Sequence, residues 1–254
     1  MVEQDIYYFY SELKDYQPKI WRRFEITGEK TIAELAYTIM IMYEMHASHL
    51  FSITQDIRKD VLKELGQEYS IEQLTPYLEK QSNKEILKRI RYELPGYEDF
   101  KIDTEKLLRA DKLKVKQITR KKGMELSCFY DFGDSWEVSI YLENCEKKER
   151  IDSDTPYVTE GEGYGIIEDV GGVYGLEKLA ASLKVRAGDE YEDYIRWLDS
   201  STLDLEMFDQ EDMNFRLREL LKVYKEIYEK YKEPSKQEVD LLLRTYKNKG
   251  SRGY

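Results

Sequence analysis

The chain has 254 residues, of which 36% are charged, and it carries a formal net charge of -11. This length accommodates one large domain or two small ones around a buried core. Its apolar runs fall short of the roughly eighteen residues that a membrane-spanning helix needs, and residues 1–5 lack the basic and apolar parts of a secretion signal. Two cysteines, Cys128 and Cys145, are too few for a secreted disulfide framework. We therefore expect a globular, cytoplasmic protein with no membrane partner.

The N-terminal part predicts two strands, a helix and a third strand. Residues 6–13 and 20–26 have the composition of strands. A capping box at residues 31–34 opens a helix over about 32–45, because apolar residues follow it at helical spacing. The chain then turns into a predicted strand at about 49–54.

The next part combines a helical insertion with a basic stretch. Residues 56–100 are predicted as a polar helical insertion, with capping-box patterns at 70–73 and 82–85. Residues 106–122 then hold eight basic residues against one acidic residue, whereas residues 143–213 hold 20 acidic residues against 7 basic ones. The basic stretch either packs over the acidic surface of the same chain or follows a nucleic-acid backbone. The acidic total favours the first interpretation.

Residues 124–142 predict a β-hairpin at the centre of the fold. Apolar and polar residues alternate on both arms, which indicates two antiparallel strands that share one apolar face. The apolar faces coincide if Phe132 lies opposite Trp136 and residues 133–135 form the turn.

This register also places acid opposite acid. The two pairs are Asp131 with Glu137 and Glu125 with Glu143. Like charges directly opposed destabilise a strand pair, by ~0.2–1 kcal/mol each. The pairs therefore predict a positive group over this face, supplied by a basic segment of the chain, a partner or a cation. Carboxylates splayed into water are the alternative.

The C-terminal half begins with a glycine-rich stretch, residues 161–175, around the adjacent acids Glu168 and Asp169. Such a stretch either turns tightly or lets another group approach its backbone. Apolar residues at helical spacing then predict four helices. These lie at about 176–183, 191–198, 217–231 and 236–246.

Candidate catalytic chemistry is sparse. The pair His46 and His49 lacks the cysteine spacing of a structural zinc site. No serine lies in a nucleophile elbow, and the glycines do not form a dinucleotide fingerprint, so neither a catalytic residue nor a cofactor is predicted. Clustered carboxylates suit a hard cation, with turn and capping roles as the alternative. The carboxylates in question are Asp131, Asp134, Glu168 and Asp169.

Five blocks of sequence together resemble the plasmid pRiA4b ORF-3-like family. The blocks are Ile20-Trp21-Arg22-Arg23, Ser48-His49-Leu50, Tyr130 to Trp136, Glu168 to Gly172 with Gly175, and Phe208-Asp209 with Asn214 and Leu217-Arg218. The resemblance implies an α+β domain associated with plasmids or mobile elements, whose biochemical role is uncharacterised. Many members have a second histidine where this chain has Phe51, so a role that needs that histidine is not carried over.

We therefore expect an α+β fold, a largely antiparallel sheet with a central hairpin packed against several helices. The expected domains are residues 1–219, with the insertion at about 56–100, and a helical extension at 220–254. The expected function is a non-catalytic module that binds a protein segment or nucleic acid in an acidic, aromatic groove. The alternative is a divalent-metal phosphodiester hydrolase, with Asp131, Asp134 and Asp169 as ligands and His49 as acid or base.

The groove is expected to combine aromatic contacts, anion-binding arginines and carboxylates. Core packing is the alternative for the two tryptophans. The oligomeric state stays open. The predicted binding residues are Trp21, Arg22, His49, Asp131, Asp134, Trp136, Glu168, Asp169 and Tyr174, with Arg23 beside them.

Overall fold

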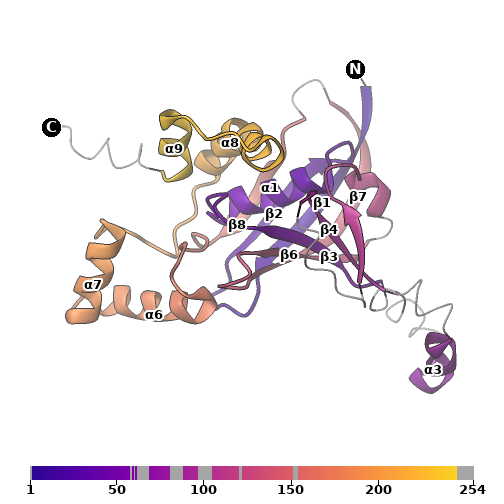
Figure 1. Cartoon of the computed structure of the whole chain (residues 1–254), viewed down its shortest axis with the longest axis horizontal. Helices are drawn as coiled ribbons and strands as arrows, with labels where there is room; N and C mark the ends of the chain where they lie inside the picture. Colours follow the sequence, from indigo (N-terminus) through magenta and orange to yellow (C-terminus); the bar gives the residue numbers. More distant parts are fainter. Residues whose placement is uncertain are drawn as a thin grey trace.

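A mostly antiparallel sheet organises the molecule (Figure 1). The computed structural model describes residues 2–57, 59, 61, 69–80, 88–96, 105–119, 122–150 and 154–244. The strands are β1 (Val2–Leu13), β2 (Trp21–Thr27), β3 (Phe51–Gln55), β4 (Arg89–Glu93), β5 (Glu105–Arg109), β6 (Glu125–Tyr130), β7 (Trp136–Arg150) and β8 (Tyr157–Glu162). Among the described residues they form one eight-stranded sheet in the order β5-β4-β3-β6-β7-β1-β2-β8. Only the β4–β5 pair in that sheet is parallel.

Helices cover one face of this sheet and extend from its ends (Figure 1). They are α1 (Ile32–Met42), α3 (Ile71–Glu79), α5 (Val115–Ile118), α6 (Gly172–Val185), α7 (Asp189–Leu198), α8 (Gln210–Lys230) and α9 (Lys236–Leu242). The predicted α+β class is therefore confirmed. In Figure 1, α6 and α7 project from one end of the molecule and α3 lies at the other end.

Helix α1 is the centre of the core. Its predicted capping box is confirmed, because Thr31 Oγ1 accepts from Glu34 N at 3.1 Å and Glu34 Oε2 accepts from Thr31 N at 2.9 Å. Ten of its eleven residues are buried, since the helix is sandwiched between the sheet and α8. Each fully buried Ile, Leu or Met side chain contributes about 1.5–3 kcal/mol, so this helix carries much of the apolar stabilisation.

The predicted register of the hairpin is wrong by two residues. Tyr130, not Phe132, lies opposite Trp136, and the loop covers residues 131–135. A shift of two keeps every side chain on its predicted face. The strand ends early because Asp131 adopts a left-handed φ of 52° and its N–H donates to Leu50 O at 3.0 Å. Phe132 is consequently 47% exposed at the hairpin tip.

The predicted acid-to-acid pairs are therefore absent from the hairpin. Phe129 faces Glu137, and Tyr141 faces Glu125. The three carboxylates that line this face each have a basic neighbour from elsewhere in the chain. The ion pairs are Lys14–Glu137 at 2.8 Å, Lys59–Glu125 at 2.6 Å and Arg23–Glu143 at 3.1 Å.

The predicted helical insertion at residues 56–100 is only partly helical in the structure. Residues 89–93 form strand β4 rather than the end of a helix, because β3 and β5 supply strand partners on both sides. Helix α3 confirms the capping box at Ser70, whereas residues 81–87 lie outside the described residues. In the basic stretch, Lys114 and Lys116 both pair with Glu29, next to the start of α1.

Buried charges tie the C-terminal helices to the rest of the molecule. Glu44, in the turn after α1, accepts from Arg216 of α8 at 2.6 Å and from Arg244 at 2.9 and 2.6 Å. Arg244 also pairs with Asp212. The expected boundary between residues 219 and 220 lies inside α8, and this network joins both sides of it.

Candidate functional site

Four of the predicted site residues converge beside the hairpin tip. The imidazole of His49 lies among three carboxylates, with Nδ1 3.6 Å from Asp131 Oδ1 and Nε2 3.6 Å from Glu168 Oε2. Asp169 Oδ1 is 3.8 Å from the same Nε2. A protonated imidazole would pair with all three, and the cluster keeps an excess of negative charge even then. We call these four residues the His49 cluster.

The local chain paths hold His49 in place. The residue follows the turn after α1, and its carbonyl oxygen accepts from Tyr228 Oη of α8 at 2.6 Å. Its ring meets Tyr130 edge to face, with centroids 5.6 Å apart. Asp131 reaches it because the N–H of Asp131 bonds to Leu50 O, one residue beyond His49. The position of His49 is therefore set by β3, β6 and α8 together.

Glu168 is a partly buried member of the cluster. Its Oε1 accepts from His46 N at 2.6 Å and from Tyr130 Oη at 2.7 Å. Burial raises the pKa of this carboxyl, against the lowering effect of the two hydrogen bonds. Its second oxygen, Oε2, is buried without a hydrogen-bond partner among the described residues and faces His49.

Glycines let the hairpin tip approach the start of α6. Gly171 N donates to Asp134 Oδ2 at 3.1 Å. A Cβ at Gly172 would lie 2.6 Å from Asp134 O, and one at Gly175 would lie 1.8 Å from Val170 O. Both distances are too short for any side chain. Gly172 therefore lets the hairpin tip approach closely, and Gly175 lets the loop turn tightly onto Val170, so the stretch has both roles that the sequence indicated.

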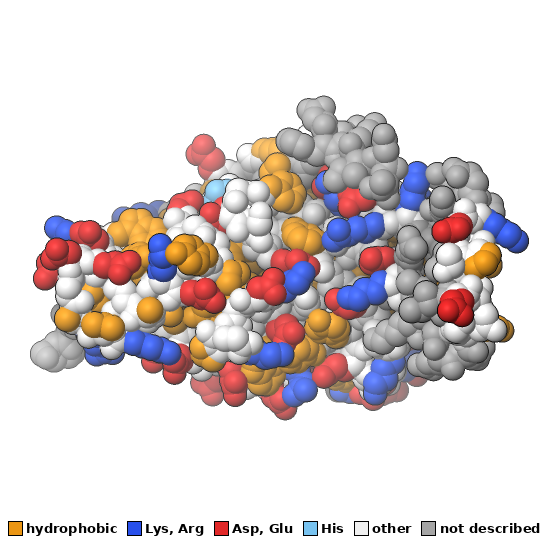
Figure 2. All heavy atoms as spheres, turned by 90° about the horizontal axis from the view of Figure 1, so that it is seen from below, with side chains coloured by type: hydrophobic (Ala, Val, Ile, Leu, Met, Phe, Trp, Pro, Cys, Tyr) orange, Lys and Arg blue, Asp and Glu red, His pale blue; other side chains and the backbone are white. Residues whose placement is uncertain are grey.

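A surface hollow opens beside Asp169. It has a volume of about 260 Å³ and is lined by Asp169, Val170, Asp193, Tyr194 and Trp197. The rings of Tyr194 and Trp197 are tilted by 53° with centroids 6.3 Å apart. Figure 2 shows hydrophobic side chains exposed among acidic ones at the end of the molecule that carries α6 and α7. Asp169 belongs to both the His49 cluster and this hollow.

Three predicted site residues lie away from the cluster. Trp136 is fully buried in the core. Arg22 is also fully buried, and its guanidinium donates four hydrogen bonds of 2.5–2.9 Å to main-chain carbonyls of Trp21 and residues 162–164. Burial lowers the pKa of Arg22 to about 10. Trp21 lies on the opposite side of β2, where it stacks on Tyr10 at 5.7 Å.

Tyr174 is in the first turn of α6 and is 67% exposed, with Lys178 Nζ 4.5 Å from its ring centroid. Asp134 is near the cluster through its bond to Gly171. Arg22 and Trp136 thus serve the interior, whereas Tyr174, Asp134 and the His49 cluster share one end of the molecule with the hollow.

Two of the carboxylates that the sequence suggested as metal ligands accept hydrogen bonds from the backbone. Asp131 Oδ1 accepts from Gly133 N at 3.0 Å and Asp134 Oδ2 accepts from Gly171 N. Across the described residues, no group of three or more His, Cys, Asp or Glu side chains has the arrangement of a metal site. The metal-dependent hydrolase remains a prediction without a geometric observation in its favour.

Sequence reasoning did not single out Asp193, Tyr194 and Trp197. The signal was the apolar pattern of residues 191–198, which predicted a helix but not what its apolar residues contact. In the structure none of the ten residues of α7 is buried. Tyr194 and Leu198 are partly buried and pack against the core, whereas Trp197 is exposed. Only the fold shows that Tyr194 and Trp197 also line a hollow open to solvent.

The fold and the site define an α+β protein in which a glycine-rich loop, held against a hairpin tip, and the projecting helix α7 line a hollow that contains two aspartates. A family model described as "Plasmid pRiA4b ORF-3-like protein" matches residues 5–215. The chain belongs to this family.

One protein sequence and one solved structure are similar to this chain over different extents. The uncharacterized protein y4hQ of Sinorhizobium fredii is 33% identical over 75 residues, which are 30% of this chain and 38% of that protein. The match thus spans well under half the length of that relative. The crystal structure of MM3350 from Methanosarcina mazei, a protein of unknown function, has a TM-score of 0.63 at 24% identity. It covers 82% of this chain and 96% of its own, and shows a shared fold.

No helix in the described ranges is both long enough and apolar enough to span a membrane.

Proposed function

We propose that this chain is a non-catalytic binding module, which receives a segment of a partner protein in the hollow beside α7. The observation that carries the proposal is the exposure of an aromatic wall next to a carboxylate. Trp197 is 49% exposed and, with Tyr194, lines the hollow opposite Asp169 and Val170. Surface sites that combine aromatic anchors with a few polar groups are typical of protein recognition.

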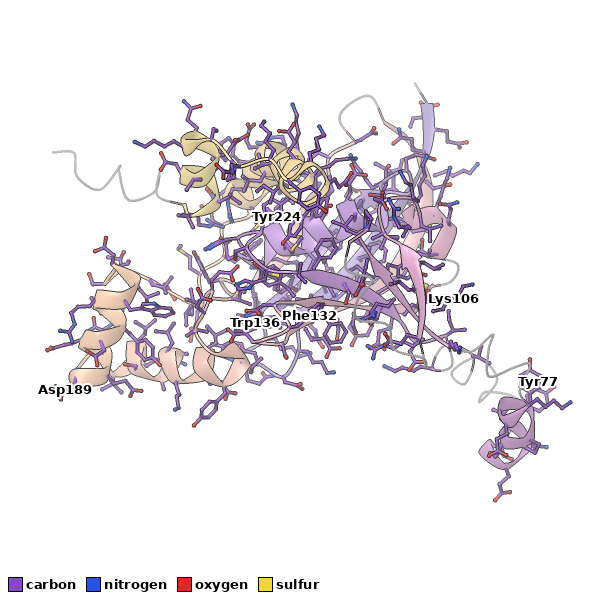
Figure 3. The ribbon with its side chains drawn as sticks, in the orientation of Figure 1. Tyr77, Lys106, Phe132, Trp136, Asp189 and Tyr224 are labelled. Atoms are coloured by element: carbon purple, nitrogen blue, oxygen red, sulfur yellow. The ribbon has the colours of Figure 1, made fainter. Side chains whose placement is uncertain are left out.

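The charge of this region favours a protein segment over nucleic acid. Between Glu168 and Asp199 there are eight acidic residues and four basic ones. Phosphate groups are repelled from such a surface. The basic stretch that would attract phosphate lies elsewhere, since Figure 3 places Lys106 and Asp189 on opposite sides of the molecule.

The hydrogen bonds around the His49 cluster support a binding role. Its hydrogen bonds hold the Glu168-Asp169 turn against the hairpin and against the loop after α1. This arrangement presents Asp169 at the rim of the hollow from a rigid base, which lowers the entropic cost of binding. We place this activity in the cytoplasm and in the setting of plasmids or mobile elements, as the sequence and its resemblance indicated.

The proposal can be tested by selecting ligands from a displayed library of random peptides with the purified chain. We expect enriched peptides whose affinity falls about tenfold or more for Trp197→Ala combined with Tyr194→Ala, since buried aromatic anchors dominate such interfaces. Tyr77→Ala is the matched control, an exposed tyrosine 49% accessible at the far end of the molecule (Figure 3). The proposal would be contradicted if no peptide were enriched, or if the enriched peptides bound the double variant as tightly as the wild type.

A further inference from the structure

We infer that the hollow takes one cationic side chain, a lysine or an arginine, of the partner segment. This inference rests on the proposed function and adds the chemistry of the ligand. The occupant is a basic peptide, because the carboxylates and the aromatic rings that line the hollow complement a cation.

Two carboxylates face the hollow from different elements. Asp169 comes from the glycine-rich loop and is 77% exposed, and Asp193 comes from α7 and is 71% exposed. Asp193 has an ion pair with Arg196 on its own helix. Asp169 has only the imidazole of His49 within ion-pair range among the described residues. Its charge is therefore the less compensated of the two.

Two aromatic rings form the wall beside these carboxylates. A cation within about 6 Å of the face of a tryptophan or tyrosine ring is attracted by the ring quadrupole. In the part of the chain that the structure describes, no lysine or arginine lies over Tyr194 or Trp197, whereas Lys178 lies over the nearby Tyr174. The hollow thus offers two rings and a carboxylate to a cation from outside.

The same combination already holds a cation elsewhere in this chain. On the open face of the sheet, the guanidinium of Arg23 lies 5.6 Å from the Tyr10 ring and 5.5 Å from the Trp21 ring. It donates to Glu143 at 3.1 Å and to Glu160 at 2.9 Å. Two rings and two carboxylates are therefore a working cation site in this fold, and the hollow repeats that composition.

The size of the hollow fits one side chain. Pockets for drug-sized ligands measure about 300–1,000 Å³, and this hollow is smaller at about 260 Å³. It is also open to solvent, which suits a side chain that enters from a peptide lying across the surface.

A peptide array tests this inference with the intact chain. One central position is varied through all twenty amino acids between randomised flanks, and binding of the purified protein is measured. We expect a preference for lysine and arginine at the centre that weakens with added salt. Asp169→Asn should lower binding of the lysine peptides about two- to fivefold, and Asp169→Lys should shift the preference to acidic residues.

Asp169→Asn is a conservative probe. Asp169 has a left-handed φ of 60°, which asparagine also tolerates. Glu219→Gln, which removes one negative charge from the exposed surface of α8, is the matched control and should change nothing. Unchanged thermal unfolding of each variant establishes that the fold is intact.

The outcomes separate the inference from the proposed function. Peptides that bind at the aromatic wall without a cationic preference, or whose preference survives Asp169→Lys, would overturn the inference and leave the binding module in place. An array with no bound peptide would overturn both.

Discussion

Two glutamates near the end of α1, the buried Glu44 and the partly buried Glu168, have opposite electrostatic surroundings. Glu44 is completely enclosed and meets two guanidinium groups, those of Arg216 and Arg244. Burial opposes ionisation of Glu44, yet the two arginines hold its pKa below the usual range. Glu168 meets one histidine and two further carboxylates, and burial raises its pKa.

The difference separates a structural cluster from a candidate site. The Glu44 network balances its charges inside the protein and joins α1, α8 and the residues after α9. The His49 cluster has more carboxylates than cations and continues into the solvent-exposed Asp169. A partner can pair with the excess negative charge of the His49 cluster, because that charge lies next to exposed aromatic side chains. The Glu44 network offers a partner nothing to pair with, since its charges are balanced in the interior.

Breaking the Glu44 network should have the largest effect. Arg216→Met leaves Glu44 buried with Arg244 as its remaining partner, and removing one member of a buried ion pair costs about 3–5 kcal/mol. The free energy of unfolding in urea measures this loss. Arg218→Met, two residues along the same helix at an exposed position, is the control and should cost less than about 0.5 kcal/mol. A loss below about 1 kcal/mol for Arg216→Met would show that the network is not structural.

Adding a side chain at Gly175, as in Gly175→Ala, should have the second largest effect on stability. Its added Cβ meets Val170 O, which forces the loop before α6 to move. Overpacking of this kind costs about 1–3 kcal/mol. The same displacement shifts Asp169 and Val170, so peptide binding should fall together with the free energy of unfolding. Retained binding in Gly175→Ala would mean that the loop position does not define the hollow.

The pH dependence of stability should distinguish the two glutamates. A lowered folded pKa means that the contribution of Glu44 is present above its unfolded pKa, about 4.3, and is lost as pH falls. A raised folded pKa means the reverse for Glu168, whose favourable contribution is present below that pH and is lost as pH rises.

Glu168→Gln isolates the second effect. The amide oxygen can still accept from His46 N and Tyr130 Oη, so we expect the variant to be at least as stable as the wild type at pH 7, by less than about 1 kcal/mol. This advantage should shrink as pH falls towards about 4. Urea unfolding between pH 4 and 7 measures it, and a variant that is less stable at neutral pH would be the contrary result.

Sequence patterns predicted the elements with local causes. The capping boxes at Thr31 and Ser70 depend on residues three apart, and both are present in the structure. The inward face of the hairpin also follows from local alternation, and Cys128 on that face is buried. Such signals depend on residues close together in the chain, so contacts with distant residues do not change the structure that they predict.

Features set by distant residues could not be predicted. A period of two cannot distinguish registers that differ by two, and the real one depends on the bond from Asp131 N to Leu50 O. The burial of Arg22 depends on carbonyls about 140 positions away in the chain. The hollow depends on how α7 lies beside the loop at Asp169. Asp169 was predicted as a site residue, whereas the α7 residues Asp193, Tyr194 and Trp197 were missed although their helix was predicted.

The central claim is that the hollow beside α7 binds a peptide segment. Calorimetric titration of one selected peptide into the wild type, into Trp197→Ala and into Tyr77→Ala tests it most directly. We predict an affinity about tenfold or more weaker for Trp197→Ala alone, with the free energy of unfolding of this variant unchanged. Equal affinity of all three proteins for the peptide would contradict it.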